Sequence, residues 1–223
     1  MIDKKLLEDT IEAQSKRLER MKSRKENYKI EVRGKEFIVL PRVFYPGTDS
    51  ILMIETVKFD PEDTVLDSCA GTGMFSVFAA NEAKKVVAVD VNKAAVENVK
   101  ENAKLHKLDD KITAMAGDLF PDFEIKFDKI SINPPYTDNS AADVVEKSVW
   151  DEGNKTTRKF FKKVKGYLNE DGKIFLSWAN FADYNFIESL IKDSGFSFKI
   201  IGKAGEGERN YRIYEIDREG SQK

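Results

Sequence analysis

The hydrophobic pattern of the chain changes near residue 64. From there on, short apolar runs of strand length alternate with longer stretches whose apolar residues recur at helical spacing. We predict strands over 65–67, 86–90, 112–116, 129–132, 174–178, 196–201 and 211–216, and helices over 74–81, 93–106, 157–168 and 185–194, with a turn at 169–172. This alternation predicts an α/β fold, with a mostly parallel sheet, an antiparallel last strand and helices on both faces.

The first 44 residues follow a different pattern. The spacing of apolar residues in 3–25 predicts a helix with one apolar stripe, formed by Leu7, Ile11, Leu18 and Met21. Gln14 interrupts this stripe. Two short apolar runs on either side of Gly34 then predict a β-hairpin, with strands over 28–33 and 36–40.

Prolines separate this N-terminal element from the rest. Pro41 and Pro46 break the chain, and Asp49 or Ser50 can cap a short helix that ends near residue 57. We therefore predict three parts: an N-terminal helix and hairpin that serves as a substrate lid or a packing element (1–44), a main domain (45–217) and a polar tail (218–223).

The charge balance restricts the kinds of partner. The chain carries 37 basic and 39 acidic residues, so a globally basic nucleic-acid binder is not indicated. Residues 1–45 hold 12 Lys and Arg against 8 Asp and Glu, and most of this excess lies in the predicted first helix. We interpret this basic run as a solvated helix face.

Cys69 and His106 are the only cysteine and histidine of the chain. A single cysteine excludes an internal disulfide and agrees with a reducing cytosol, so we expect a cytoplasmic protein. A single histidine excludes a histidine-rich site, and we expect no metal. No apolar stretch approaches the length of a membrane span, and the polar start is unlike a signal peptide, so we expect no membrane association.

A glycine-rich loop follows the first predicted strand of the main domain. It runs from Asp67 through Cys69 and Gly71 to Gly73, and it lets a ligand approach the backbone closely. A dinucleotide-binding loop would have a third glycine where this chain has Ser76. The missing glycine and the acidic start of the loop favour S-adenosylmethionine, whose amino-acid end needs an acid and backbone groups. We interpret Cys69 as structural, because no base lies near it in the sequence.

Two further acids follow predicted strands. Asp90 ends the second strand, where its carboxylate can accept hydrogen bonds from the ribose hydroxyls of either cofactor. Asp118 follows the third strand and can accept from an adenine amino group while Leu119 packs on the ring. Asp118 is equally well explained as a turn residue, so both interpretations stay open.

The tetrapeptide Asn133-Pro134-Pro135-Tyr136 follows the fourth strand and favours a methyl donor. An amide or aromatic amine nitrogen is a poor nucleophile because its lone pair is delocalised. Two acceptors, the Asn133 side-chain oxygen and the Pro134 carbonyl, can hold its N–H groups and stabilise the positive charge that develops. The prolines fix the backbone, and Tyr136 can stack on a flat acceptor.

At these residues the chain resembles class I S-adenosylmethionine-dependent methyltransferases that modify amino nitrogens. Among them it is most similar to the HemK-type branch, which methylates the side-chain amide of glutamine in translation release factors. Related enzymes methylate exocyclic amines of RNA or DNA. The resemblance runs from about residue 45 to residue 216 and includes the segments 45–50 and 150–154. It implies a Rossmann-like sheet and S-adenosyl-L-methionine as the cofactor.

The resemblance also implies roles for individual residues. Those implied to contact the donor are Thr48, Asp67, Cys69, Gly71, Gly73, Asp90, Val91, Asp118, Leu119 and Asn133. Those implied to act in catalysis are Asn133, Pro134 and Tyr136, and those implied to contact the acceptor are Tyr45, Pro135, Tyr136 and Trp150.

The N-terminal element departs from the resemblance. Bacterial release-factor enzymes carry a larger helical N-terminal domain that docks the substrate, and here one helix and a hairpin take its place. The shorter eukaryotic and archaeal branch lacks that domain and works with a small partner protein. We therefore expect a protein or peptide substrate, and we leave open a nucleic-acid substrate, a small amine or amide, a small partner protein and a homodimer.

Two function classes compete with a methyltransferase. A nicotinamide-dependent oxidoreductase is disfavoured by Ser76 and would leave the loop at Asn133 without a purpose. A non-catalytic binding protein that keeps the fold would be expected to carry other residues at positions 133 or 67. The chain has the asparagine and the aspartate that the methyltransferase interpretation needs there.

Overall fold

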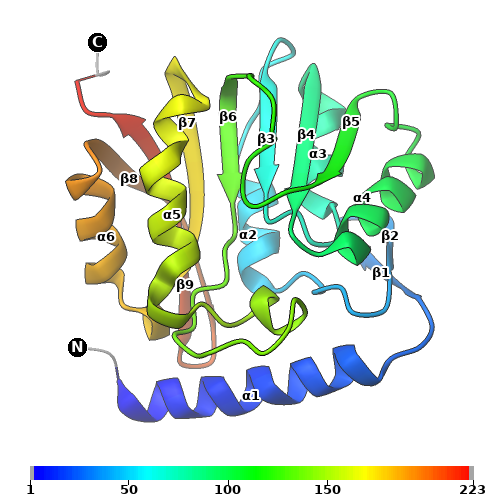
Figure 1. Cartoon of the computed structure of the whole chain (residues 1–223), viewed down its shortest axis with the longest axis vertical. Coiled ribbons are helices and arrows are strands. Elements are labelled where there is room, and N and C mark those ends of the chain that lie inside the picture. The colour runs from blue at the N-terminus through cyan, green and yellow to red at the C-terminus, as the bar shows by residue number, and fades with distance from the viewer. Residues whose placement is uncertain (1–2, 221–223) are drawn as a thin grey trace.

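A computed structural model describes residues 3–220 of the chain (Figure 1). Within this range the main sheet has seven strands in the order β5-β4-β3-β6-β7-β9-β8. Their bounds are β3 (Thr64–Ser68), β4 (Lys85–Asp90), β5 (Ile112–Ala116), β6 (Phe127–Ile132), β7 (Leu168–Ala179), β8 (Phe196–Glu206) and β9 (Arg209–Arg218). The predicted α/β fold is confirmed.

The direction of the strands follows from their connections. Helical crossovers join β3 to β4 and β4 to β5, and these pairs are parallel, as are β3 with β6 and β6 with β7. A short turn joins β8 to β9, so these two strands pair antiparallel. The last strand, β9, inserts between β7 and β8 and is antiparallel to both. The predicted antiparallel last strand is therefore correct, and the edge position belongs to β8.

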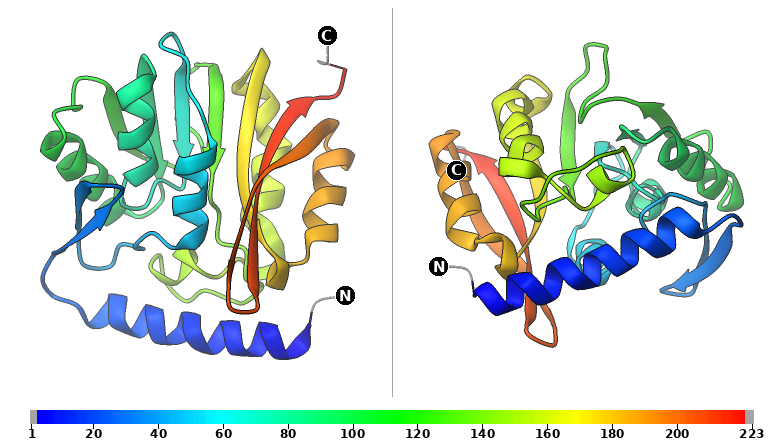
Figure 2. Two further views of the ribbon diagram at one scale, coloured as in Figure 1. Left: turned by 180° about the vertical axis from the view of Figure 1, so that it is seen from behind. Right: turned by 60° about the horizontal axis from the view of Figure 1, so that its bottom comes forward.

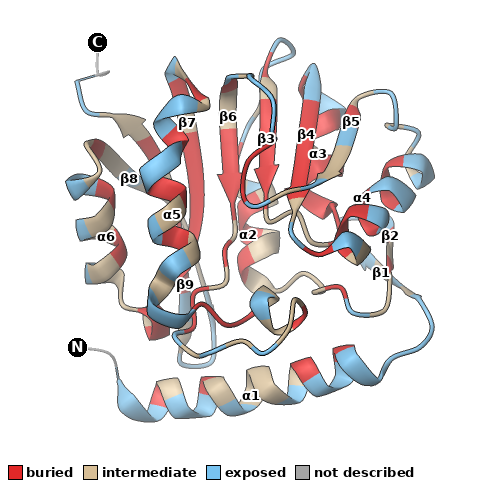
Figure 3. Ribbon diagram, viewed as in Figure 1, coloured by how far each residue is buried: buried red, intermediate tan, exposed pale blue. Residues whose placement is uncertain are grey.

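Helices cover both faces of the sheet, as Figure 2 shows. One face carries α2 (Thr48–Thr56) and α3 (Met74–Glu82), with α4 (Lys93–Leu105) beside α3 near the β5 edge. The other face carries α5 (Lys155–Lys163) and α6 (Tyr184–Asp193). Because helices cover them on both sides, the central strands are almost wholly buried (Figure 3).

The N-terminal hairpin packs on α4. Its strands are β1 (Tyr28–Val32) and β2 (Lys35–Val39), and Phe37 is completely buried. The side-chain oxygens of Asn102 and Asn98 accept from the backbone N–H groups of Ile38 and Leu40, each at 2.8 Å. These bonds satisfy backbone groups on the edge strand β2 and attach the hairpin to the main domain.

The first helix, α1 (Lys4–Ser23), crosses the edge of the sheet at which the parallel strands end (Figure 1). Asp3 caps its start, since its Oδ1 accepts from the backbone N–H of Leu6 at 3.1 Å. A small apolar cluster holds the helix to the segment after β6; its buried members are Leu18, Met21, Val145, Val149 and Trp150. This cluster is separate from the main core.

The buried face of α1 differs from the predicted stripe. Leu18 and Met21 are buried as predicted, but Leu6 and Thr10 are the other buried residues, and Leu7 and Ile11 are only half-buried. The face of α1 that packs against the main domain is therefore rotated relative to the predicted apolar stripe. It includes the polar residues Gln14 and Arg17. The predicted solvated basic face is wrong for Arg17, whose guanidinium is largely buried.

Three predicted element boundaries are also wrong. Gly47, not Asp49 or Ser50, is the N-cap of α2. The helix predicted over 157–168 leaves α-geometry after Lys163 and ends in a short 3₁₀ turn. The turn predicted at 169–172 lies inside β7, where four residues bulge out between the paired Leu168 and Lys173.

The C-terminal end of the main domain differs from the prediction by one residue. Arg218, predicted to begin the tail, is the last residue of β9, and residues 221–223 lie outside the described range. No helix within residues 3–220 combines the length and apolar composition that crossing a membrane requires.

Candidate active site

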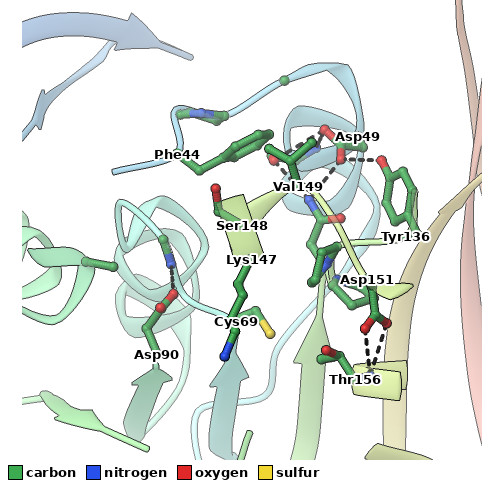
Figure 4. A pocket seen from close by; sticks show the side chains of 18 of the residues that line it. Phe44, Asp49, Cys69, Asp90, Tyr136, Lys147, Ser148, Val149, Asp151 and Thr156 are labelled. Atoms are coloured by element: carbon green, nitrogen blue, oxygen red, sulfur yellow. Dashed lines mark hydrogen bonds between the residues drawn. The ribbon is translucent and has the colours of Figure 1, made fainter. Parts of the chain in front are cut away.

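A cavity of about 960 Å³ opens where the parallel strands end (Figure 4). Loops after β3, β4, β5 and β6 line its floor, and α1 and the segment before α2 line its mouth. Ligands of doubly wound sheets bind at this edge, and the volume is typical of a small-molecule site. All but one of the site residues named from the sequence line this cavity; they are Tyr45, Thr48, Asp67, Cys69, Gly71, Asp90, Val91, Asp118, Leu119, Asn133, Pro134, Pro135, Tyr136 and Trp150. The exception is Gly73, which is the N-cap of α3 at the end of the loop after β3.

The loop after β3 is tightly folded. Cys69, Gly71 and Gly73 all have positive φ, at 64°, 55° and 75°. A Cβ added at Gly73 would lie 2.9 Å from Cα of Val99 in α4, so only glycine fits between this loop and that helix. The Cys69 backbone N–H donates to the carbonyl of Val89 at 2.9 Å, and burial raises the pKa of its thiol well above the usual range. Both facts agree with a structural cysteine.

Asp67 is buried beneath this loop. Its carboxylate accepts from the hydroxyls of Ser76 at 2.6 Å and Ser131 at 3.1 Å. Burial raises the pKa of Asp67 to about 6, against the lowering effect of these hydrogen bonds. Ser76 occupies the position of a dinucleotide loop's third glycine, and it serves here to hold Asp67.

Asp90 ends β4 with part of its hydrogen-bonding capacity in use. Its two oxygens accept from the backbone N–H groups of Gly71 at 2.9 Å and Asn92 at 2.8 Å. Burial raises the pKa of Asp90. A carboxylate offers about four acceptor sites, so two remain for a pair of ribose hydroxyls. Val91 beside it is 51% exposed and lines the cavity.

The residues after β5 differ in exposure. The Asp118 side chain is exposed and pairs with Lys159. Leu119 is buried with a φ of 76°, and its carbonyl accepts from the hydroxyl of Ser68 at 2.8 Å. Leu119 thus presents an apolar side chain at a fixed place beside the glycine loop.

The loop after β6 brings Asn133 against the start of α2. The Asn133 amide nitrogen donates to Oδ2 of Asp49 at 3.0 Å and to the hydroxyl of Ser50 at 3.2 Å. The Tyr136 hydroxyl donates to the same Oδ2 at 2.9 Å. Burial raises the pKa of Tyr136, and the nearby charge of Asp49 adds to the effect. The Tyr136 ring packs on Trp178 and Phe181, with centroids 5.3 and 5.7 Å away.

The remaining predicted residues lie at the mouth of the cavity. Tyr45 stacks on Phe44. The Thr48 hydroxyl donates to Glu206 at 2.9 Å. Trp150 is buried in the small cluster beneath α1. Tyr45 and Thr48 belong to the segment at the start of α2, and only folding brings Trp150 to the same cavity.

Sequence reasoning missed Asp49 and Arg17 as site residues. Asp49 is 7% exposed and bonds two residues of the loop after β6. The Arg17 guanidinium lies over the rings of Phe44 and Tyr45, at 3.8 and 3.7 Å from their centroids, and donates to the Tyr45 carbonyl. Its desolvation lowers the pKa of Arg17. One feature of the sequence could have indicated that α1 faces the cavity. Gln14 interrupts the apolar stripe of this helix, and Gln14 lines the cavity together with Arg17.

No cluster of three or more histidine, cysteine or acidic residues suited to a metal ion occurs within residues 3–220.

Comparisons with known proteins decide the family. A family model described as methyltransferase small domain matches residues 45–206. The chain belongs to this methyltransferase family. Its cofactor is therefore S-adenosylmethionine, as the glycine loop predicted, and it is an S-adenosylmethionine-dependent N-methyltransferase of the HemK-like type.

Three similar proteins illustrate the relationship. A Methanocaldococcus jannaschii protein provisionally named a protein N5-glutamine methyltransferase is 30% identical over 178 residues, which cover 77% of this chain and 89% of that protein. The release factor glutamine methyltransferase of Aquifex aeolicus is 38% identical over 130 residues, 55% of this chain and 46% of that enzyme. A T. thermophilus 16S rRNA N2 methyltransferase, solved with AdoMet and guanosine, superposes with a TM-score of 0.67 at 22% identity, covering 86% of this chain and 50% of that one. The chain thus spans about half the length of the last two proteins.

Asp67 gives a prediction for stability against pH. Its pKa is about 6 in the folded methyltransferase and roughly 4 in an unfolded chain. The folded state therefore binds this proton more tightly, and the contribution of Asp67 to the free energy of unfolding should decrease as pH rises from about 4 to 6. We expect Asp67→Asn to melt at a higher temperature than the wild type at pH 7, and the difference to shrink at pH 4.5. Thermal melts at both pH values measure this, and an unchanged or lower melting temperature at pH 7 would contradict it.

Proposed function

We propose that this methyltransferase transfers the methyl group to the side-chain amide nitrogen of a glutamine in a protein or peptide. The observation that carries the proposal is the position of Asn133. Its amide nitrogen is held by Asp49 and Ser50, so its oxygen remains available beside the Pro134 carbonyl in the cavity. The names of the M. jannaschii and A. aeolicus relatives, which refer to glutamine, support the same acceptor.

The proposed chemistry uses two oxygen acceptors and no strong base. When bound, the donor supplies an electrophilic methyl group on a positively charged sulfur. Asn133 and Pro134 accept the two N–H groups of the acceptor amide and localise its lone pair toward the methyl group. Nitrogen gains positive charge as the N–C bond forms and the C–S bond breaks, and these oxygens stabilise it. The nitrogen then loses a proton to water.

We assign the donor-contacting residues as the sequence suggested. Asp67, Gly71 and Gly73 hold the amino-acid part, Asp90 holds the ribose, and Asp118 and Leu119 flank the adenine. Cys69 and Val91 complete the wall of the donor pocket, and Thr48 and Asn133 reach it from the acceptor side. Tyr45, Pro135, Tyr136 and Trp150 border the acceptor.

Asp90 offers a direct test of donor binding. Asp90→Ala removes the only acceptor assigned to the ribose, so we expect binding of S-adenosylhomocysteine to weaken by about 1–3 kcal/mol, as for lost hydrogen bonds to a charged group. Calorimetry measures the affinity. Asp63→Ala provides the control, because Asp63 is a buried aspartate that pairs with Lys129 outside the cavity. Equal affinities for wild type and Asp90→Ala would rule out this assignment.

We further propose that residues 1–44 act as a lid that selects the acceptor. The observation behind this is that α1 lies across the mouth of the cavity and lines it with Thr10, Ala13, Gln14, Arg17 and Arg20. A small partner protein or a second copy of the chain could complete this surface in solution. The lone, unpaired cysteine fits a cytoplasmic setting.

A nucleic-acid acceptor is the second candidate. It is favoured by the exposed basic residues of α1, among them Lys5 and Lys16, which do not line the cavity. Replacing both with glutamate should lower the affinity for a nucleic-acid acceptor and flatten its salt dependence. A protein acceptor should barely respond, which is the result we expect. KM at two salt concentrations measures this, with the double variant Lys100→Glu, Lys104→Glu on the remote helix α4 as the charge-matched control.

Transfer of a labelled methyl group into a fractionated cell extract tests the proposed function. We expect label in protein that protease releases and ribonuclease does not, located on glutamine by mass spectrometry of peptides. Label found only in RNA or in small molecules would exclude the glutamine proposal and leave the reaction class intact.

A further inference from the structure

Asp49 connects the start of α2 to the loop after β6. Its Oδ2 accepts from the Asn133 amide nitrogen at 3.0 Å and from the Tyr136 hydroxyl at 2.9 Å. Its Oδ1 accepts from the backbone N–H of Ser50 at 2.8 Å. Figure 4 shows Asp49 and Tyr136 joined at the wall of the cavity. Asp49 as a residue is 7% exposed, so protein groups replace most of its contacts with water.

The chemistry of a carboxylate determines which way the Asn133 amide faces. An ionised carboxylate only accepts hydrogen bonds, whereas an amide group has a donating nitrogen end and an accepting oxygen end. Only the nitrogen end of Asn133 can therefore face Asp49, and the Ser50 hydroxyl receives the second N–H at 3.2 Å. The opposite end, the oxygen, is turned away from both residues. No hydrogen bond within residues 3–220 uses this oxygen.

The charge of Asp49 has no ion-pair partner within residues 3–220. Arg17 is a largely buried cation that interacts electrostatically with Asp49 without forming an ion pair, and the two groups flank Gly47. A Cβ on Gly47 would lie 3.0 Å from Oδ1 of Asp49 and 3.7 Å from Nη1 of Arg17. A buried carboxylate without a salt bridge is costly. Such a cost is explained if the negative charge is needed where positive charge develops on an acceptor nitrogen.

We propose that Asp49 is a positioning residue that orients Asn133 for catalysis. It holds the amide nitrogen of Asn133, aims the amide oxygen at the acceptor N–H group, and polarises that oxygen through the amide. Tyr136 helps to hold Asp49 in place, because its hydroxyl donates a hydrogen bond to the same carboxylate. The proposal rests on the proposed transfer to a planar nitrogen, and it adds a residue outside the loop after β6 to the machinery.

Replacing Asp49 with asparagine tests the proposal. The new amide has nearly the same shape, but it can donate as well as accept, so it no longer decides which end of Asn133 faces it. We expect kcat to decrease by about 10- to 100-fold, by analogy with the loss seen when a residue that orients a metal ligand is replaced. KM and the affinity for S-adenosylhomocysteine should stay near the wild-type values. A purely structural role would instead lower stability and donor binding together.

The side-chain signals of Asn133 give a second measurement that needs no acceptor. In ¹⁵N-labelled protein, the Asn133 NH₂ signals are identified by their loss in Asn133→Ala. We expect them to exchange slowly with water in the wild type and at least about tenfold faster in Asp49→Asn, since a hydrogen bond to a charged group is the stronger kind. Asp63→Asn, a buried aspartate variant outside the cavity, should leave them unchanged.

Two results would overturn the proposal. One is an Asp49→Asn variant whose kcat and KM match the wild type on an acceptor that the wild type methylates. The other is Asn133 signals that keep their positions and exchange rates in Asp49→Asn. If no amide acceptor is methylated by the wild type, the proposed function fails, while the Asn133 signals still decide whether Asp49 orients this side chain.

Discussion

Asn133→Ala will lower the rate of methyl transfer by about a hundredfold to a thousandfold, the usual loss when one preorganised polar group is removed from a transition state. The lost interaction belongs mainly to the transition state, so kcat should decrease far more than the affinity for the donor. Single-turnover transfer of a labelled methyl group measures the rate, and calorimetry with S-adenosylhomocysteine measures the affinity.

The control for this variant is Asn139→Ala. Asn139 lies in the segment that follows the loop, and its side-chain oxygen accepts from the N–H of Ser140. It is not among the residues that line the cavity. If Asn133→Ala turns over at the wild-type rate on the true acceptor, the role assigned to Asn133 is wrong, whatever the donor affinity.

Removing α1 is expected to abolish transfer to the natural acceptor. A chain that begins at Lys25 keeps the hairpin, whose Phe37 belongs to the main core, and loses the cluster around Leu18 and Met21. We expect it to fold and bind the donor, because Asp67 and Asp90 belong to the main sheet. Without α1, the part of the lid that lines the cavity, kcat/KM should decrease by about a hundredfold or more, as expected when an acceptor is no longer positioned.

The double variant Leu18→Ala, Met21→Ala provides a milder form of the same test. It removes the apolar contacts of α1 with the cluster and keeps the full chain. Replacing Glu12 and Glu19 with alanine on the exposed face of α1 is the matched control. If both the shortened chain and the double variant lose donor binding together with transfer, α1 is a packing element and the lid proposal is wrong. Retained transfer in both would also exclude a lid.

The sequence alone predicted the main fold because its signals are local. Strand and helix periods in 64–216 depend on residues a few positions apart, and the positions of β4 and β5 were predicted within one residue. The predicted element boundaries were wrong where a contact between residues far apart in the sequence sets them. The turn predicted at 169–172 lies in β7, because the strand resumes its pairing with β6 after a bulge.

The sequence also identified the reaction class through Asn133 and the glycine loop. Their chemistry follows from residue type and from their place at strand ends, which a parallel sheet brings to one edge. Gly73 shows why the pattern is informative, since φ of 75° and the contact with Val99 admit no other residue. The residue types that these backbone constraints require all lie within the short loop 67–73, so the sequence alone makes them visible.

Only the tertiary structure decided which residues complete the site. Asp49 lies 84 positions before Asn133, and nothing local to either residue indicates that they are hydrogen-bonded. Arg17 belongs to a helix whose sequence predicted a solvated basic face, yet it is buried against Phe44 and Tyr45. Burial depends on which elements meet, and so do the raised pKa of Asp67 and the orientation of the Asn133 amide. A sequence encodes these long-range contacts only through the packing of the whole fold.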